Sequence, residues 1–258
     1  MRRVLQILAL FGLDPARLWQ TLRGLPGFAL EALHYRRLST GSRFPLRVAG
    51  LRPLLGDRAA AAGVAFGHYF HQDLWAARLI HAAKPASHVD VGSRLDGFVS
   101  HLLVFLPLVR VIDIRPLESR VAGLEFVRAD ATDLAWVEDD SVLSLSSLHA
   151  VEHFGLGRYG DKIDPEAPFR AMRALARVLA PGGRLYFSVP VGQERLEFNA
   201  QRVFAPRTVI EGFRGLDLLS FGVVTDDDRL VEAADPDELG RARYACGLFV
   251  FTKPAAAR

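Results

Sequence analysis

The chain has 258 residues, half of them apolar, which is enough for one large α/β domain or for a smaller one with a helical extension. Its single cysteine, Cys246, excludes an intrachain disulfide and a cysteine-based zinc site, and it favours a reducing, cytoplasmic setting. The net charge of +3 is unevenly distributed, because residues 1–84 carry 12 basic and 4 acidic side chains whereas residues 85–258 carry 20 and 25. The first segment is therefore expected either to face an anionic partner or to be a solvated, arginine-rich surface.

The chain opens with Met1-Arg2-Arg3 and an apolar run over residues 4–13, in the order of charge and hydrophobicity found in signal peptides. No small-x-small cleavage site follows, and ten apolar residues are too few to span a bilayer as a helix. An amphipathic helix fits better, docked on the protein itself, on a second copy in a homodimer, or on the surface of a membrane. Residues 1–40 are the candidate for a peripheral membrane contact.

Glycine and proline interrupt the helical patterns of residues 1–60 and predict several short helices there. The interruptions are Gly24, Pro26, Gly27, Gly41, Pro45, Gly50 and Pro53. A stronger helix is predicted over residues 66–84, where apolar side chains recur at helical spacing up to Lys84-Pro85. Residues 1–84 are thus predicted to form a helical extension and lid, and residues 85–258 a separate domain.

From His88 onward, short β-rich runs alternate with helical segments. The predicted strands are residues 88–92, 109–114, 124–128, 141–147, 184–190, 217–224 and 245–252, and the predicted helices lie near residues 96–106, 166–179 and 206–214. The alternation predicts a doubly wound α/β fold, with a mainly parallel sheet of seven strands covered on both faces. The last two strands are expected to form a hairpin, and the long polar loop at residues 148–165 is expected to be functional.

Acidic side chains at the strand ends predict a nucleoside site. Asp113 closes the second strand about twenty residues after Asp90-Val91-Gly92-Ser93, and its two oxygens can accept both ribose hydroxyls. Asp113 can instead cap a turn with Arg115. Gly92 lets the backbone approach a ligand, and Asp90 can either anchor this loop or accept a hydrogen bond from an ammonium group.

The neighbouring positions refine this site. Arg94 stands where a dinucleotide-binding loop has its second glycine, so tight pyrophosphate binding is not expected. Asp96 is predicted to cap the helix that follows. Asp130, after the third strand, can accept from an exocyclic amine such as that of adenine, or can be an ordinary turn acid.

The predicted helix near residues 166–179 is stopped by a Pro-Gly-Gly run that leads directly into a strand, in the sequence Leu179-Ala180-Pro181-Gly182-Gly183-Arg184-Leu185. With this run, the series of motifs over residues 85–252 resembles class I S-adenosylmethionine-dependent methyltransferases. Within that class, the segment from Ser147 to Asp161 resembles an uncharacterised bacterial family linked to surface-polysaccharide synthesis. The resemblance implies a Rossmann-like fold, S-adenosylmethionine as cofactor, and a sugar, glycan or glycolipid acceptor. It implies a cofactor site made of Asp90, Gly92, Ser93, Asp113, Ile114, Asp130, Ala131 and Ser147. Arg94 departs from the glycine usual in the class, and it is included in the site because an arginine there could pair with the cofactor carboxylate.

His149, Glu152 and His153 follow the fourth strand, beside the place where the methyl group would be presented. A histidine can take the proton of an acceptor hydroxyl, and a neighbouring carboxylate can orient the ring or stabilise its cation. We favour His153 over His149 as this base. The segment can instead only position the loop and pack against the cofactor. Two histidines and a glutamate can also hold a divalent cation, but they form no fixed ligand set, and no metal is predicted.

Loop side chains are the candidates for acceptor binding: Tyr69, Gln72, Arg158, Tyr159, Asp161 and Asn199. Tyr69 can also serve only in packing. A nucleic-acid acceptor is not expected, because the basic residues cluster in the N-terminal extension and no aromatic-basic strand platform is present. Two alternative functions stay open: a methyltransferase acting on a small molecule or protein, and a scaffold that binds the nucleoside without chemistry. Arg94 favours the scaffold.

Overall fold

The computed structural model describes residues 11–255, and its contacts divide the chain into two compact units, Met1–Val64 and Ala65–Arg258. The apolar run predicted as an amphipathic helix lies, over residues 4–10, outside the described residues. None of the helices within residues 11–255 is both long and apolar enough to cross a membrane. The membrane or homodimer contact of residues 1–40 stays a prediction.

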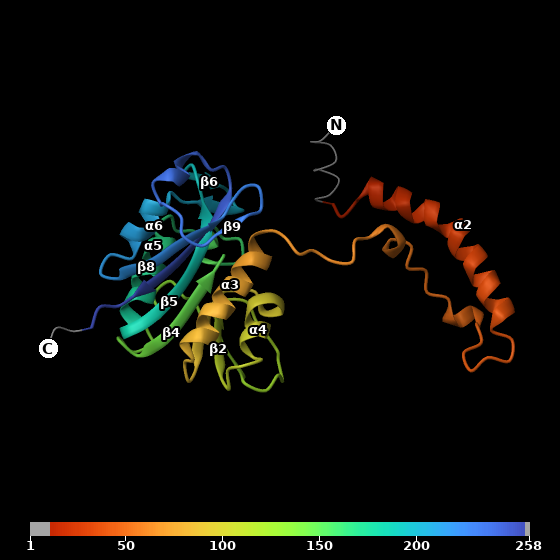
Figure 1. Ribbon diagram of the computed structural model, residues 1–258, viewed down its shortest axis with the longest axis horizontal. Helices are drawn as coiled ribbons and strands as arrows, with labels where there is room; N and C mark the ends of the chain where they lie inside the picture. Colours follow the sequence, from red (N-terminus) through yellow and green to blue (C-terminus); the bar gives the residue numbers. More distant parts are fainter. Residues whose placement is uncertain (1–10, 256–258) are drawn as a thin grey trace. The chain divides into compact units, whose positions relative to one another are not determined.

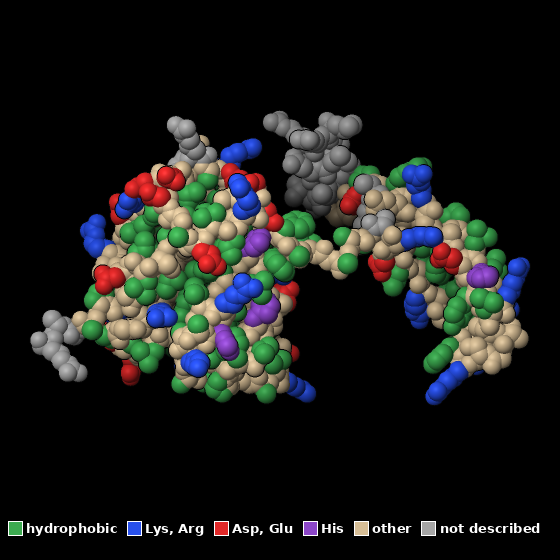
Figure 2. Space-filling view, viewed as in Figure 1, with side chains coloured by type: hydrophobic (Ala, Val, Ile, Leu, Met, Phe, Trp, Pro, Cys, Tyr) green, Lys and Arg blue, Asp and Glu red, His purple; other side chains and the backbone are tan. Residues whose placement is uncertain are grey.

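From residue 11 onward, the first unit has one long helix, α2 (Pro15–Leu38), and two short 3-10 turns, η1 (Val48–Gly50) and η2 (Asp57–Ala59). The prediction of short helices is wrong for residues 15–38, because α2 continues through Gly24 and Pro26. A proline already has a helical φ, so its cost is limited to one lost backbone hydrogen bond and a local clash. Among its described side chains only Ser39 is buried, and Figure 2 shows apolar and basic side chains interspersed along α2.

The second unit is built on an eight-stranded sheet with the order β3-β2-β1-β4-β5-β10-β8-β9 (Figure 1). Its strands are β1 (His88–Val91), β2 (Val109–Asp113), β3 (Leu124–Arg128), β4 (Val142–Leu148), β5 (Leu179–Val191), β8 (Asp217–Val224), β9 (Leu230–Val231) and β10 (Ala245–Thr252). Strands β1 to β5 are parallel, and β10 pairs antiparallel with both β5 and β8. The mainly parallel α/β sheet and the reversed last strand are confirmed.

Three short strands were not predicted. One is β9, which adds two residues to the edge of the sheet, so the sheet has eight strands rather than seven. The other two, β6 (Arg195–Glu197) and β7 (Gln201–Val203), form a separate antiparallel ribbon. Segments of two or three residues are too short to show an alternation of apolar and polar side chains.

Helices cover both faces of the sheet, as a doubly wound fold requires. The helical elements of this unit are α3 (His68–Ala83), the π-helical turn η3 (Leu95–Val99) with α4 (Ser100–Leu102), η4 (Val151–His153), α5 (Ala167–Val178), α6 (Pro206–Gly212) and η5 (Glu238–Arg241). One core cluster joins α5 and α6 to the sheet and contains Phe249, and the other joins α3 and α4 to the opposite face and contains Leu248. These two neighbours on β10 point to opposite faces, which is the normal alternation of a strand.

Helix α3 belongs to the second unit. Its side chains Trp75, Ala76 and Ile80 are buried in the core cluster on one face of the sheet. Burial of this apolar stripe ties the helix to the domain that follows it in the chain. The contacts therefore divide the chain after Val64, rather than after residue 84 as the sequence suggested.

Candidate functional site

A pocket lies at the carboxyl ends of β1, β2 and β4. Nine of the predicted site residues line it: Gly92, Asp113, Ile114, Asp130, Ala131, His149, His153, Tyr159 and Asp161. Sequence reasoning missed three polar lining residues, Arg115, Thr132 and Arg170, whereas Lys162, which also lines the pocket, was expected with its loop to select the acceptor. Carboxyl ends of parallel strands meet at one edge of a sheet, and this is where open α/β sheets bind their ligands.

The turn after β1 requires a glycine. Gly92 has a φ of +74°, and a Cβ atom on it would lie 2.9 Å from the Cβ of Ala150. A side chain there would be strained in backbone conformation and would also collide with the segment after β4. The backbone of Gly92 is therefore open to a ligand in the pocket.

Asp90 anchors this turn from behind and does not line the pocket. Its carboxylate is fully buried and accepts hydrogen bonds from the Ser93 amide (3.0 Å), the Ser93 hydroxyl (2.6 Å) and the Ser146 hydroxyl (2.5 Å). Burial nevertheless raises the pKa of Asp90 to about 6. Of the two roles predicted for Asp90, the structure shows the anchor. Ser147 is likewise buried and donates to the Val91 carbonyl (2.9 Å), so it joins β4 to β1.

Sequence reasoning missed His88, which extends the Asp90 network into the core. Its Nε2 lies 2.8 Å from the Ser146 hydroxyl oxygen and its Nδ1 lies 2.7 Å from that of Ser144. Because the Ser146 hydroxyl donates to Asp90, its oxygen accepts from His88 Nε2–H, and Nδ1 accepts from Ser144. Burial lowers the pKa of His88 to about 3, so the ring is neutral.

Arg94 also lies outside the lining of this pocket. Its guanidinium donates to both carboxylate oxygens of Asp96, at 3.2 and 3.0 Å, and lies over the ring of Tyr69 at 4.9 Å. The prediction that Asp96 caps the next helix is wrong, because η3 starts without a side-chain cap and Asp96 pairs with Arg94 instead. A charge-assisted bond to an arginine competes well with a single backbone amide.

Asp113 is paired within its own turn. Its Oδ1 accepts from the amide (2.8 Å) and Nε (3.0 Å) of Arg115, and its Oδ2 accepts from Nη2 (2.5 Å). Arg115 also stacks on Tyr159 at 4.6 Å. The structure thus shows the turn pairing, and these three bonds leave about one acceptor site on the carboxylate, so acceptance of both ribose hydroxyls requires Arg115 to release at least one of them. Asp130 accepts from the Thr132 amide (2.8 Å), as a turn acid does, while it lines the pocket.

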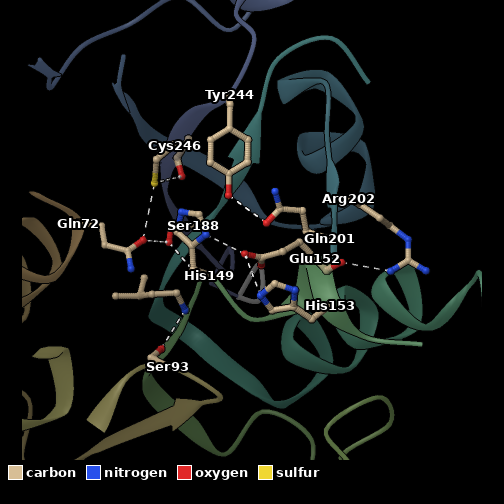
Figure 3. A network of polar contacts seen from close by, with 12 residues as sticks. Gln72, Ser93, His149, Glu152, His153, Ser188, Gln201, Arg202, Tyr244 and Cys246 are labelled. Carbon is tan, nitrogen blue, oxygen red and sulfur yellow. Dashed lines mark hydrogen bonds and ion pairs between the residues drawn. The ribbon is translucent and has the colours of Figure 1, made fainter. Parts of the chain in front are cut away.

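His149 and Glu152 form a buried pair after β4. His149 Nδ1 lies 2.8 Å from Glu152 Oε1, and Glu152 is fully buried. Burial alone would lower the pKa of His149, but the facing Cys246 and Glu152 raise it well above its usual value. Figure 3 shows His149 between these two side chains. Glu152 therefore orients His149 rather than lining the pocket.

His153 presents a free basic nitrogen. Its Nδ1 lies 2.7 Å from the Ala200 carbonyl, which can only accept, so Nδ1 carries the proton and Nε2 has the lone pair. Burial lowers the pKa of His153, which keeps the ring neutral, and Glu152 Oε1 lies 3.7 Å from Nε2. This arrangement suits a proton acceptor whose cation is stabilised by a nearby carboxylate. Arg158 also donates to Ala200 (2.8 Å) and holds the loop from outside the pocket lining.

The remaining predicted acceptor residues separate into two groups. Tyr159 and Asp161 line the pocket, although the Asp161 carboxylate also accepts three backbone amides of its own loop. Gln72 is buried and accepts from the Ser188 hydroxyl (2.6 Å), so it serves in packing. Tyr69, 40% exposed, packs against His149, and Asn199 is exposed beyond the pocket lining.

Comparisons with known proteins agree with the fold. A family model described as Caenorhabditis protein of unknown function, DUF268, matches residues 131–232, which run from the end of β3 to β9. No curated protein matches the chain. Among solved structures, the [4+2]-cyclase SpnF aligns with a TM-score of 0.52 and 16% identity, over 71% of this chain and 82% of its own.

Two methyltransferases align similarly. The N-methyltransferase NodS from Bradyrhizobium japonicum, in complex with S-adenosylhomocysteine, has a TM-score of 0.50 and 17% identity over 71% of this chain and 86% of its own. The 1,6-didemethyltoxoflavin-N1-methyltransferase from Burkholderia thailandensis, also with S-adenosylhomocysteine, has the same score and identity over 71% and 78%. Structural neighbours of this chain thus include S-adenosylmethionine-dependent methyltransferases of varied substrates, and the Rossmann-like fold predicted from the sequence is confirmed. The cyclase among them shows that this fold alone does not define the reaction.

Proposed function

We propose that the chain is an S-adenosylmethionine-dependent methyltransferase. One observation carries the proposal: a single pocket at the carboxyl edge of the sheet brings together the open turn at Gly92, the strand-end carboxylate of Asp113 and the basic Nε2-bearing ring of His153. The same fold carries S-adenosylhomocysteine in two of the aligned methyltransferases.

The glycine turn of the pocket suits this cofactor as it stands. The carboxylate proposed to bind the ribose, that of Asp113, first has to be released by Arg115. A Cβ on Gly92 would fill the space against Ala150, so the absence of a side chain keeps the turn accessible. Asp113 would accept the ribose hydroxyls after Arg115 gives up its bonds, and Arg115 is half-exposed, so its guanidinium can be solvated when it moves. Ile112 and Ala131 add apolar walls that suit a planar base.

The chain's own residues then do three things. Asp113 and the Gly92 turn hold the donor in one orientation, which supplies much of the rate of an in-line displacement. His153 Nε2 takes the proton from the acceptor hydroxyl, and the buried Glu152 stabilises the resulting imidazolium. S-adenosylmethionine, when bound, supplies an electrophilic methyl group.

The acceptor we propose is a hydroxyl of a sugar, glycan or glycolipid. Support comes from the resemblance of the segment from Ser147 to Asp161 to a family linked to surface polysaccharides, and from the polar rim of the pocket. Lys162, Arg170 and Asp161 bring charges of both signs to that rim, and such groups suit a ligand rich in hydroxyls or bearing a phosphate.

Calorimetry with S-adenosylhomocysteine tests the cofactor site. The wild type should bind at micromolar concentrations, and Asp113→Ala should bind at least about tenfold more weakly, because two hydrogen bonds to a charged group are lost. Asp217→Ala, which removes an exposed acid at the start of β8, is the matched control and should bind normally. No binding by the wild type at high micromolar concentration, or unchanged binding by Asp113→Ala, would overturn the proposal.

Turnover of a labelled methyl donor with a cell-envelope extract tests the chemistry. His153→Ala should lower turnover by about 10²-fold or more while S-adenosylhomocysteine affinity stays the same. His101→Ala, at an exposed position on α4, controls for loss of a histidine. Equal turnover by His153→Ala and the wild type would remove His153 as the base.

A non-catalytic binding protein is the second candidate. The observation that favours it is Arg94, which stands in the place of the loop's second glycine and donates to Asp96 outside the pocket. A scaffold would bind S-adenosylhomocysteine and transfer no methyl group to any component of the extract.

A further inference from the structure

Three side chains that are far apart in the sequence meet at the same edge of the sheet. His68 begins α3, His149 follows β4, and Cys246 lies near the start of β10. One ring nitrogen of each histidine and the Cys246 sulfur lie within 4.8 Å of one another. His149 and Cys246 are buried, and His68 is half-buried, so the cluster can be reached from the His68 side.

A second observation points to a ligand in this cluster. The Nε2 atom of His149 is buried, its side chain is 3% exposed, and it finds no hydrogen-bond partner in the described chain. Its Nδ1 is held by Glu152 at 2.8 Å. A buried polar nitrogen without a hydrogen-bond partner lowers the stability of the fold by about 1–3 kcal/mol, so this unpaired nitrogen indicates that a ligand binds here.

We propose that His68, His149 and Cys246 bind a divalent zinc-type cation. One sulfur and two imidazole nitrogens form a donor set that zinc prefers. A carboxylate that accepts from the second nitrogen of a ligating histidine is the usual outer partner in zinc sites, and Glu152 stands in that place. A single cysteine excludes sites built on cysteines alone, but not a site completed by two histidines.

The distances require a small closure. Zinc bonds of about 2.1 Å to nitrogen and 2.3 Å to sulfur in a tetrahedron would place the donor atoms about 3.4–3.6 Å apart. The half-buried ring of His68, at the first residue of α3, can supply this movement by a change of rotamer. Binding needs a Cys246 thiolate and a free lone pair on His149 Nε2, so the protons on Cys246 Sγ and on His149 Nε2 both leave for solvent.

Three donors leave one position open, because no fourth His, Cys, Asp or Glu joins the cluster within the described residues. His149 also lines the pocket at the carboxyl ends of the strands. The open position could take water, or a hydroxyl oxygen of an acceptor bound in that pocket. That last role rests on the proposed methyl transfer, whereas the binding of the cation does not.

Cobalt titration of the purified, metal-free chain tests the site. Co²⁺ should bind stoichiometrically, give the near-ultraviolet absorption of a cobalt–thiolate bond together with the visible bands of a tetrahedral ion, and be displaced by Zn²⁺. Cys246→Ser should abolish the thiolate absorption, and His68→Gln should weaken binding at least about tenfold. His81→Gln, at the exposed far end of α3, is the matched control and should bind like the wild type.

Glu152→Gln provides a variant that keeps all three donor side chains. It should weaken binding about 10- to 100-fold, because the outer partner of His149 loses its charge. Far-ultraviolet circular dichroism of each variant separates loss of the site from loss of the fold. Absence of the thiolate absorption in the wild type, or wild-type affinity in His68→Gln, would overturn the proposal. Calorimetry with S-adenosylhomocysteine on the same samples keeps the two proposals apart, since cobalt binding without S-adenosylhomocysteine binding would refute only the methyltransferase.

Discussion

The buried histidine behind the glycine turn offers a direct test of the electrostatics of this fold. His88 is neutral, donates to Ser146 through Nε2 and accepts from Ser144 at Nδ1. The substitution His88→Gln keeps an amide donor in its place and removes the titrating group. We expect this change to alter how the free energy of unfolding depends on pH.

The sign and size follow from the pKa values. Burial lowers the pKa of folded His88 from 6.5 to about 3, so between these pH values the unfolded chain binds a proton at this histidine and the folded chain does not. The stabilisation is complete above pH 6.5 and is lost progressively down to pH 3, and it falls by about 2 kcal/mol between pH 7 and pH 5. Asp90 acts in the opposite direction. Burial raises its pKa from 3.8 to about 6, so the folded chain takes up a proton as the pH falls, and this adds about 1 kcal/mol to the free energy of unfolding between pH 7 and pH 5.

Urea unfolding of the full chain at pH 7, 6 and 5 measures the difference. His88→Gln removes the histidine contribution and leaves that of Asp90. When the pH is lowered from 7 to 5, the free energy of unfolding of the wild type should therefore fall by about 2 kcal/mol relative to that of the variant. All other titrating groups cancel in this comparison. His101→Gln, an exposed histidine on α4, should follow the wild type. Parallel pH dependence in the wild type and His88→Gln would refute the reasoning.

Three further predictions concern the turn, the core and the strand-end carboxylate. Gly92→Ala should lower the free energy of unfolding by about 1–3 kcal/mol and weaken S-adenosylhomocysteine binding at least about tenfold in calorimetry. The control is Gly160→Ala, which should retain this affinity, because Gly160 also has a positive φ (+82°) but a Cβ there would meet no atom within 4 Å. Leu145→Ala should cost about 2–5 kcal/mol in urea unfolding, and Leu143→Ala on the same strand, 66% exposed, less than about 0.5 kcal/mol. Arg115→Ala should tighten S-adenosylhomocysteine binding about two- to fivefold by removing a partly exposed competing ion pair, and weaker binding would show that Arg115 contacts the ligand.

The sequence predicted what depends on local pattern. The seven main strands carry β-rich apolar runs separated by helices or polar turns, so their positions follow from the sequence pattern. Gly92 and Asp113 were found because the ends of parallel strands must share one edge. The pairing of Asp113 with Arg115 was foreseen as an alternative, since two residues of one turn can bond locally.

What depends on distant contacts could not be predicted. The course of α2 through Pro26 contradicts local propensity. His68 and Cys246 are separated by most of the chain, and they meet only because β10 is reversed and so begins at the carboxyl edge of the parallel strands. The role of Glu152 as a partner of His149, rather than as a pocket acid, depends on side-chain directions that a motif does not contain.

The position of β10 also has a consequence for synthesis on the ribosome. This strand lies inside the sheet, between β5 and β8, yet it is the last of the eight strands to be translated. Until residues 245–252 emerge, β8 and β9 have no bond to the rest of the sheet, and β5 leaves one side open. The nascent domain therefore has an exposed strand edge late in translation, the kind of edge that pairs wrongly with other chains. The insertion of β10 therefore completes the sheet and at the same time places Cys246 at the carboxyl edge of the parallel strands.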